Sequence, residues 1–201
     1  MQKTNDARSF QKFKNWSIPG KGIRLCRNNG SAHCCLAAHV VPGWSPACCD
    51  VPTDISLDAI SGHWQIYQYK KGHRYSTDDV LTAWYGSIKA PSASRILDLG
   101  SGIGSVALMA AWRATGAHVV TVEAQDSSYE LAKKSVEHNG LQHRFDQRLG
   151  DLRDASILAD QTEPFDLILG SPPYFPLGTG VLGEHPQTIP CRFEVRGDIA
   201  D

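Results

Sequence analysis

Four short strand patterns alternate with helical patterns between residues 95 and 170, and this alternation leaves few folds open. Residues 95–99, 118–122 and 165–169 have the length and aliphatic content of buried strands, and residues 144–149 form a weaker strand pattern. Helical patterns occupy residues 105–115 and 127–138. Strands that alternate with helices form parallel sheets with right-handed crossovers. We therefore expect an α/β fold built on a parallel sheet.

The chain upstream of this region divides into two parts. Residues 64–69 alternate between polar and apolar and predict another strand. Ser76, Thr77, Asp78 and Asp79 then open a helix, because hydroxyl caps and acidic residues stabilise a helix N-terminus. Residues 1–60 are punctuated by Pro and Gly and show no clean period. We predict an irregular, Cys-rich extension over residues 1–60 and a folded domain over residues 61–201.

Cysteine is concentrated in the extension, which holds five of the six: Cys26, Cys34, Cys35, Cys48 and Cys49. The chain is neither small nor dense in cysteine and has no secretory signal, so reduced thiols are the default. Zinc is an alternative, with His33 and His39 nearby, but the close C-x(2–4)-C pairs of zinc sites are missing. We expect irregular packing of these residues and no metal site.

Polar or glycine-rich residues follow each of the four strand patterns. Asp98, Gly100, Gly102 and Gly104 follow the first, Glu123 the second, Asp151 the third and Ser171 to Tyr174 the fourth. Ligands of parallel sheets bind beyond the carboxyl ends of the strands. The G-x-G-x-G spacing differs from the dinucleotide fingerprint, and Asp98 beside it favours a cationic ligand. Glu123 is placed to accept from ribose hydroxyls, although it could instead cap the next helix.

The Ser171-Pro172-Pro173-Tyr174 segment is the most specific motif. Two prolines fix the backbone and remove N–H donors, which leaves carbonyl oxygens directed into the site. The Ser171 oxygen and the Pro172 carbonyl would provide two acceptors for one amino group, and the Tyr174 ring a face on which a planar base can stack. An ordinary proline-rich turn is the alternative. The motif suits methyl transfer to an exocyclic amine.

Together these motifs resemble the class I S-adenosylmethionine-dependent methyltransferases, with their Rossmann-like sheet. Within that class the chain is similar to the small-domain group that includes bacterial tRNA adenine-N6 methyltransferases. The closer likeness rests on His73 to Asp79, on Tyr174 to Gly180 and on Cys191-Arg192-Phe193-Glu194. It covers about residues 62–201 and leaves the Cys-rich extension unexplained.

The resemblance implies a role for each motif residue. Asp98 and Gly100, within the loop that includes Gly102 and Gly104, would meet the methionine end of S-adenosylmethionine, and Glu123 its ribose. Asp151 would accept from the adenine amino group, with Leu152 against the ring. Thr77 and Asp78 would close the pocket over the methionine moiety. Ser171, Pro172, Pro173 and Tyr174 would hold the target amine, and the reaction would need no metal.

The expected function is methyl transfer to an exocyclic amine of a nucleic-acid base, in the first place N6 of adenine in tRNA. Ser171 stands where adenine-modifying relatives have Asn or Asp, and Ser-Pro-Pro-Tyr resembles the cytosine-N4 DNA methyltransferases, so the base stays open. The alternatives are a glutamine-N5 methyltransferase of the release-factor type, a non-catalytic cofactor-binding or partner-docking remnant, and a Rossmann oxidoreductase. The glycine spacing disfavours the last.

Charge and hydropathy set further bounds. The formal net charge of −1 and the pI near 6.7 give no whole-molecule case for nucleic-acid binding, so a local patch would have to provide it. No apolar run has the roughly 18–20 residues of a membrane span. We expect a cytoplasmic protein, with organelle targeting as an alternative because the first 27 residues are rich in Lys and Arg. The sequence leaves the oligomeric state open.

The end of the chain departs from the family pattern. After the fourth strand, the fold expects a further helix and about three more strands, each unit taking roughly 30 residues. Only the segment from residue 175 to Asp201 follows Tyr174. We expect the last strands to be missing and the chain to be a fragment or a degenerate copy. One face and one edge of the sheet would then be uncovered, which predicts poor solubility.

Overall fold

The computed structural model describes residues 26–28, 31–33, 54–176 and 185–193. The chain divides into two compact units, residues 1–50 and 51–201. In the first unit, strands β1 (Cys26–Asn28) and β2 (Ser31–His33) pair antiparallel. The contacts we expected for Cys34, Cys35, Cys48 and Cys49 lie outside the described residues.

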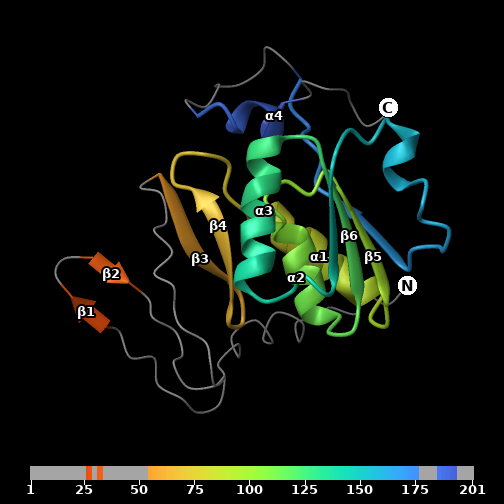
Figure 1. Ribbon diagram of the computed structural model, residues 1–201, viewed down its shortest axis with the longest axis horizontal. Helices are drawn as coiled ribbons and strands as arrows, with labels where there is room; N and C mark the ends of the chain where they lie inside the picture. The colour runs from red at the N-terminus through yellow and green to blue at the C-terminus, as the bar shows by residue number, and fades with distance from the viewer. Residues whose placement is uncertain (1–25, 29–30, 34–53, 177–184, 194–201) are drawn as a thin grey trace, which may run out of the picture. The chain divides into compact units, whose positions relative to one another are not determined.

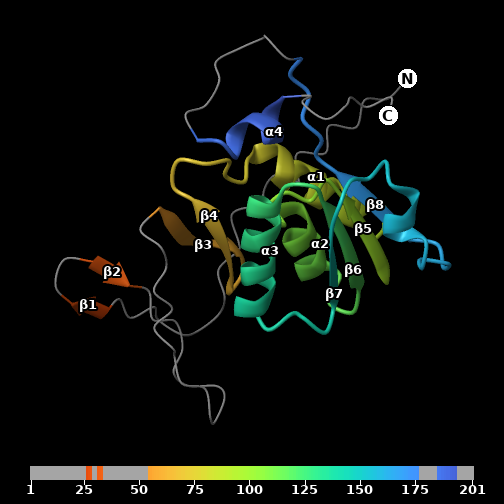
Figure 2. The same ribbon diagram turned by 45° about the horizontal axis from the view of Figure 1, so that its top comes forward.

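A four-stranded parallel sheet forms the centre of the second unit (Figure 1), with strand order β7-β6-β5-β8 (Figure 2). Its strands are β5 (Arg95–Leu99), β6 (His118–Glu123), β7 (Phe145–Leu149) and β8 (Leu167–Gly170). Helices α2 (Ser105–Arg113) and α3 (Asp126–His138) connect consecutive strands, as the alternation of patterns predicted. The α/β fold class and its parallel sheet are thereby confirmed.

Helices cover one face of this sheet. Helix α1 (Thr77–Lys89), α2 and α3 pack their apolar sides on residues that point to the same face, such as Ile96, Val119 and Leu169 (Figure 2). On the opposite face Leu97, Val120 and Val122 form a smaller cluster, and the 3₁₀ turn η2 (Ala155–Leu158) packs against it. The two faces therefore differ greatly in the cover that the described residues give them.

An antiparallel hairpin precedes the sheet. It consists of β3 (Ile55–Ser61) and β4 (Trp64–Tyr69), and β4 is fixed to α3 by a hydrogen bond from the Tyr67 N–H to Ser135 Oγ at 2.9 Å. Residues 55–60, which we assigned to the irregular extension, are therefore part of a strand. The sequence pattern concealed this strand because it contains the polar residues Ser56 and Asp58. Their partner is Gln68 in β4: Ser56 Oγ donates to its carbonyl, and its side-chain amide donates to Asp58 Oδ2.

Strand β8 pairs with β5 alone among the described residues, and it exposes Ile168 to 58%. Helix α1, which contacts β8, exposes a row of large apolar side chains at helical spacing: Leu81, Trp84, Tyr85 and Ile88. Within the described residues, the apolar stripe on α1 and the edge strand β8 therefore belong to elements that contact each other. The uncovered edge and the poor solubility that we expected remain predictions.

Candidate active site

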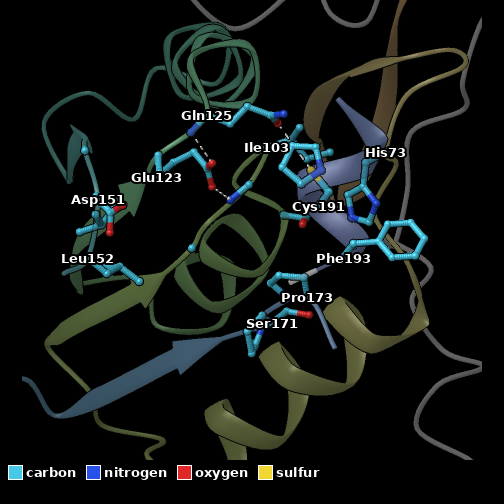
Figure 3. Close-up of a pocket in the computed structure, with 18 of the residues that line it drawn as sticks. His73, Ile103, Glu123, Gln125, Asp151, Leu152, Ser171, Pro173, Cys191 and Phe193 are labelled. Atoms are coloured by element: carbon cyan, nitrogen blue, oxygen red, sulfur yellow. Dashed lines mark hydrogen bonds between the residues drawn. The ribbon is translucent and has the colours of Figure 1, made fainter. Parts of the chain in front are cut away.

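A hollow of about 300 Å³ lies at the carboxyl ends of the parallel strands (Figure 3). It is lined by residues from all four strand ends. Those named from the sequence are Gly100, Gly102, Glu123, Asp151, Leu152, Ser171, Pro172 and Pro173. We call this space the first hollow. Four segments separated along the chain converge here because parallel strands place all their carboxyl ends at one edge of the sheet.

The glycine loop between β5 and α2 forms one wall of the first hollow. Gly100 and Gly102 have φ angles of +65° and +55°, and a Cβ added to either would meet no atom within 4 Å. Open space next to the backbone is what a ligand that approaches the loop closely requires. Gly104 has a different role: it precedes α2, and its Cβ would lie 3.3 Å from Ala132 Cβ, so it allows α2 and α3 to pack closely.

Glu123 supports the loop while facing the first hollow. Its Oε2 accepts from the Gly102 N–H and its Oε1 from the Gln125 N–H, both at 2.7 Å. Gln125 is the residue that caps α3. Both readings of Glu123 from the sequence thus have a counterpart: it lies in the wall of the hollow and also bonds at the start of the next helix.

Asp98 lies behind the glycine loop and does not line the first hollow. It is 1% exposed, its Oδ2 accepts from the Ala107 N–H at 3.1 Å, and its Oδ1 has no hydrogen-bond partner among the described residues. Burial, opposed by the Ala107 hydrogen bond and reinforced by Asp79 and Glu123, raises the pKa of Asp98 to about 8. A buried carboxyl with an unused oxygen is suited to receive a cationic donor.

Asp151 and Leu152 lie on the far side of the first hollow. Arg153 binds the Asp151 carboxylate through an ion pair of 2.7 Å and through its backbone N–H at 3.0 Å. Leu152 is 44% exposed and offers an apolar surface. A carboxylate beside an apolar surface can receive a planar heterocycle that carries an amino group.

Several residues of the first hollow were not predicted from the sequence. Two of them, Cys191 and Phe193, belong to the short helix α4 (Thr188–Arg192) and the residue after it. Their only sequence signal was the family likeness at residues 191–194. His73 and Asp79 belong to the quoted motif His73 to Asp79, which runs into the first turn of α1, yet we assigned the pocket roles there to Thr77 and Asp78 instead.

Gln187 holds the α4 segment over the first hollow. It is 2% exposed; its Oε1 accepts from the His73 N–H at 2.9 Å, and its Nε2 donates to Ser128 Oγ at 3.0 Å. Cys191 then lies beside Ser128 and Gln125. Burial, aided by Glu123, raises the pKa of the Cys191 thiol to about 12, so it stays a neutral thiol and not a nucleophile at neutral pH.

A second hollow of about 350 Å³ shares five lining residues with the first: His73, Asp79, Ser171, Pro172 and Cys191. Tyr174 and Asp78 line it, and Tyr174 is 61% exposed. Asp78 therefore faces this second space and not the first, and Thr77 lines neither of them. Our expectation that Thr77 and Asp78 close the first hollow finds no support in these positions, because the first turn of α1 directs Asp79 inward; Asp79 is 6% exposed and bonds to Ser76 N and Ser105 Oγ.

The described part of the chain contains no helix of the length and apolarity that a membrane crossing needs.

In comparisons with known proteins, residues 81–180 match the family described as the methyltransferase small domain. The chain is 34% identical over 103 residues to a tRNA1(Val) (adenine(37)-N6)-methyltransferase of Glaesserella parasuis. This alignment covers 51% of this chain and 41% of the relative. The likeness to the enzyme of that name from a Flavobacteriaceae bacterium is 32% over 110 residues, or 55% and 45% of the two chains. The chain thus spans about half the length of these curated relatives.

A solved structure agrees in fold. The S-adenosylmethionine-dependent methyltransferase from Agrobacterium tumefaciens aligns with a TM-score of 0.51 at 19% identity, over 63% of this chain and 42% of the other. Family match, curated relatives and fold point the same way. Through residues 81–180 the chain belongs to the methyltransferase small domain family, and its sheet has the fold of the class I S-adenosylmethionine-dependent methyltransferases.

Proposed function

We propose that the chain transfers a methyl group from S-adenosylmethionine to an exocyclic amine of a nucleic-acid base, with N6 of adenine in tRNA as the first candidate. The observation that carries the proposal is that two hollows adjoin and that Ser171 and Pro172 of the acceptor motif are among the five residues that line both. A transfer between two bound molecules needs two adjoining spaces with the reacting atoms at their junction.

The lining of the first hollow supports S-adenosylmethionine as its ligand. The open backbone at Gly100 and Gly102 would accommodate the methionine part. Asp98 lies behind this loop and outside the lining, where its Oδ1, unpartnered among the described residues, would attract the cationic amino group. Glu123 would accept from the ribose hydroxyls, with Asp151 and Leu152 at the adenine. When bound, the cofactor supplies a methyl group that is already activated by its attachment to a sulfonium.

The second hollow would hold the acceptor. Ser171 and the Pro172 carbonyl would accept the two hydrogens of the amine, which leaves the lone pair of its nitrogen pointing at the methyl donor. The Tyr174 ring would stack on the base. The amine nitrogen forms a bond to the methyl carbon while the carbon–sulfur bond breaks, and its electron pair stays on sulfur. The amine proton is then released to water. Positioning provides the rate enhancement, since no side chain has to act as nucleophile.

The choice of acceptor rests on the relatives. Both curated relatives described above are named as enzymes that act on adenine N6 of a valine tRNA, and a flipped or unpaired base is what an open site beside Tyr174 can receive. Glutamine of a release factor would place an amide nitrogen at the same junction. The two acceptor classes differ in their product, which is a methylated nucleoside in one case and a methylated glutamine in the other.

The test is to incubate the purified chain with isotopically labelled S-adenosylmethionine and unmodified tRNA, and then to identify methylated nucleosides by mass spectrometry. N6-methyladenosine supports the proposal, and N4-methylcytidine would move the target to cytosine. A labelled glutamine in a release-factor peptide, with unlabelled tRNA, would refute a nucleic-acid acceptor. Cofactor binding without any transfer would leave only the non-catalytic alternative. Asp98→Ala should lose cofactor binding, and Glu163→Ala, which changes an exposed acid that lines neither hollow, should keep it.

A further inference from the structure

A hydrogen bond joins the acceptor motif to the start of helix α1. The Tyr174 hydroxyl donates to Asp78 Oδ2 at 3.1 Å, across 96 positions of sequence. Both residues line the second hollow, and neither lines the first. The contact therefore lies in the space where the acceptor would enter.

The backbone next to Tyr174 is held from the other side. The Phe175 N–H donates to the Arg192 carbonyl at 3.2 Å, and the Phe175 ring lies 4.8 Å from the Tyr174 ring, centroid to centroid, at 46°. Tyr174 is nevertheless 61% exposed. Among the described contacts of Tyr174, the Asp78 bond is the one that fixes the tip of the ring.

The charges around the hydroxyl favour this bond at neutral pH. Asp78, through its hydrogen bond and its charge, raises the pKa of Tyr174 above the usual value near 10, while Arg192 opposes and Asp79 adds a little. The hydroxyl therefore stays protonated and remains a donor.

We propose that Asp78 is a positioning residue for the acceptor: it holds the Tyr174 ring in the orientation on which the base stacks. This inference rests on the proposed function and gives Asp78 a task different from closing the cofactor pocket. An exposed tyrosine that is free to rotate loses side-chain freedom when a base stacks on it. A ring that is already fixed avoids that loss, which favours binding of the acceptor and leaves binding of the cofactor unaffected.

The test is a double-mutant cycle with Asp78→Ala, Tyr174→Phe and the two combined. Each single change removes one end of the same hydrogen bond. We expect each to lower kcat/KM for tRNA roughly three- to tenfold, the size of one hydrogen bond, and the double variant to be no worse than the singles. Affinity for S-adenosylmethionine should be unchanged in all three. Asp78→Asn should retain most of the activity, because its amide oxygen still accepts from the hydroxyl.

Two matched controls accompany the cycle. Tyr85→Phe alters another exposed tyrosine of similar accessibility, 57%, and Glu130→Ala removes an exposed helical acid far from the site. Both should leave kcat/KM unchanged. Losses that multiply in the double variant would overturn the inference. A fall in S-adenosylmethionine affinity for Asp78→Ala but not for Tyr174→Phe would also overturn it and return Asp78 to the cofactor.

A second readout separates failure of this inference from failure of the proposed function. The ultraviolet titration of Tyr174 is obtained by subtracting the curve of Tyr174→Phe from that of the wild type, and again in the Asp78→Ala background. We expect the Tyr174 titration to move to lower pH when Asp78 is removed. An unchanged titration refutes the contact even if tRNA is methylated. A wild-type protein that methylates no base refutes the proposed function and with it the acceptor role of Asp78, whether or not the titration shifts.

Discussion

Replacing Asp98 with asparagine should change how the stability of the ligand-free protein depends on pH. The pKa of Asp98 is about 8 in the folded protein and near 3.9 in an unfolded chain. Between these values the folded state binds one more proton than the unfolded state. Asp98 therefore contributes stability that is fully present below about pH 4 and is lost as the pH rises towards 8.

The size of the effect follows from one proton. A difference of one bound proton changes the free energy of unfolding by about 1.4 kcal/mol per pH unit, so the wild type should lose about 3 kcal/mol relative to Asp98→Asn between pH 5 and pH 7. Asparagine keeps an oxygen for the Ala107 N–H, which is bonded at 3.1 Å. The comparison therefore removes the titration and preserves this bond.

Urea unfolding at pH 5, 6 and 7 measures the difference directly. Asp154→Asn is the matched control: hydrogen bonds from Ser156 lower the pKa of Asp154, so it is ionised in both states over this range and the substitution should give a constant offset. Parallel stability curves for wild type and Asp98→Asn would show that Asp98 is ionised in the folded protein. The account of Asp98 as a neutral, buried carboxyl waiting for a cationic donor would then be wrong.

Further predictions concern the ligand, the loop, the acceptor motif and the surface. Binding of S-adenosylmethionine at pH 6.5 should release close to one proton from Asp98, measured by calorimetry in buffers of different ionisation enthalpy; a value near zero would contradict the cation–carboxylate pair. Gly104→Ala should lower the free energy of unfolding by about 1–2 kcal/mol, because its φ of +83° strains any side chain. Tyr174→Ala should keep cofactor affinity and lose about 1–3 kcal/mol in kcat/KM for tRNA, whereas an unchanged rate would exclude stacking. Leu81→Glu combined with Ile88→Lys should reduce aggregation seen by light scattering, since both side chains are about half exposed; unchanged aggregation would show that the α1 stripe is not its cause.

The sequence was sufficient for the parallel sheet and for several residues that line the first hollow. Strand and helix patterns depend on local periodicity, and the order of strands and helices then places every strand end at one edge. This is why Gly100, Glu123, Asp151 and Ser171, each identified from its place after a strand pattern, line one hollow.

Contacts between distant segments could not be read in the same way. Strand β3 contains polar residues whose partner, Gln68, lies in the next strand, so its pattern was hidden. Cys191 and Phe193 reach the first hollow because Gln187 bonds to residues 59 and 114 positions away. No local period records such pairings.

The amino-acid sequence by itself determined the fold class and the residue types at each strand end, because both follow from the spacing of neighbouring residues. Only the tertiary structure decided what those residues face. It placed Asp98 behind the glycine loop, Asp79 where it lines both hollows, and Asp78 in the second hollow alone, against Tyr174. The reason is geometric: successive residues of a helix point about 100° apart, so the surroundings of each of two adjacent aspartates depend on how the helix packs against the sheet.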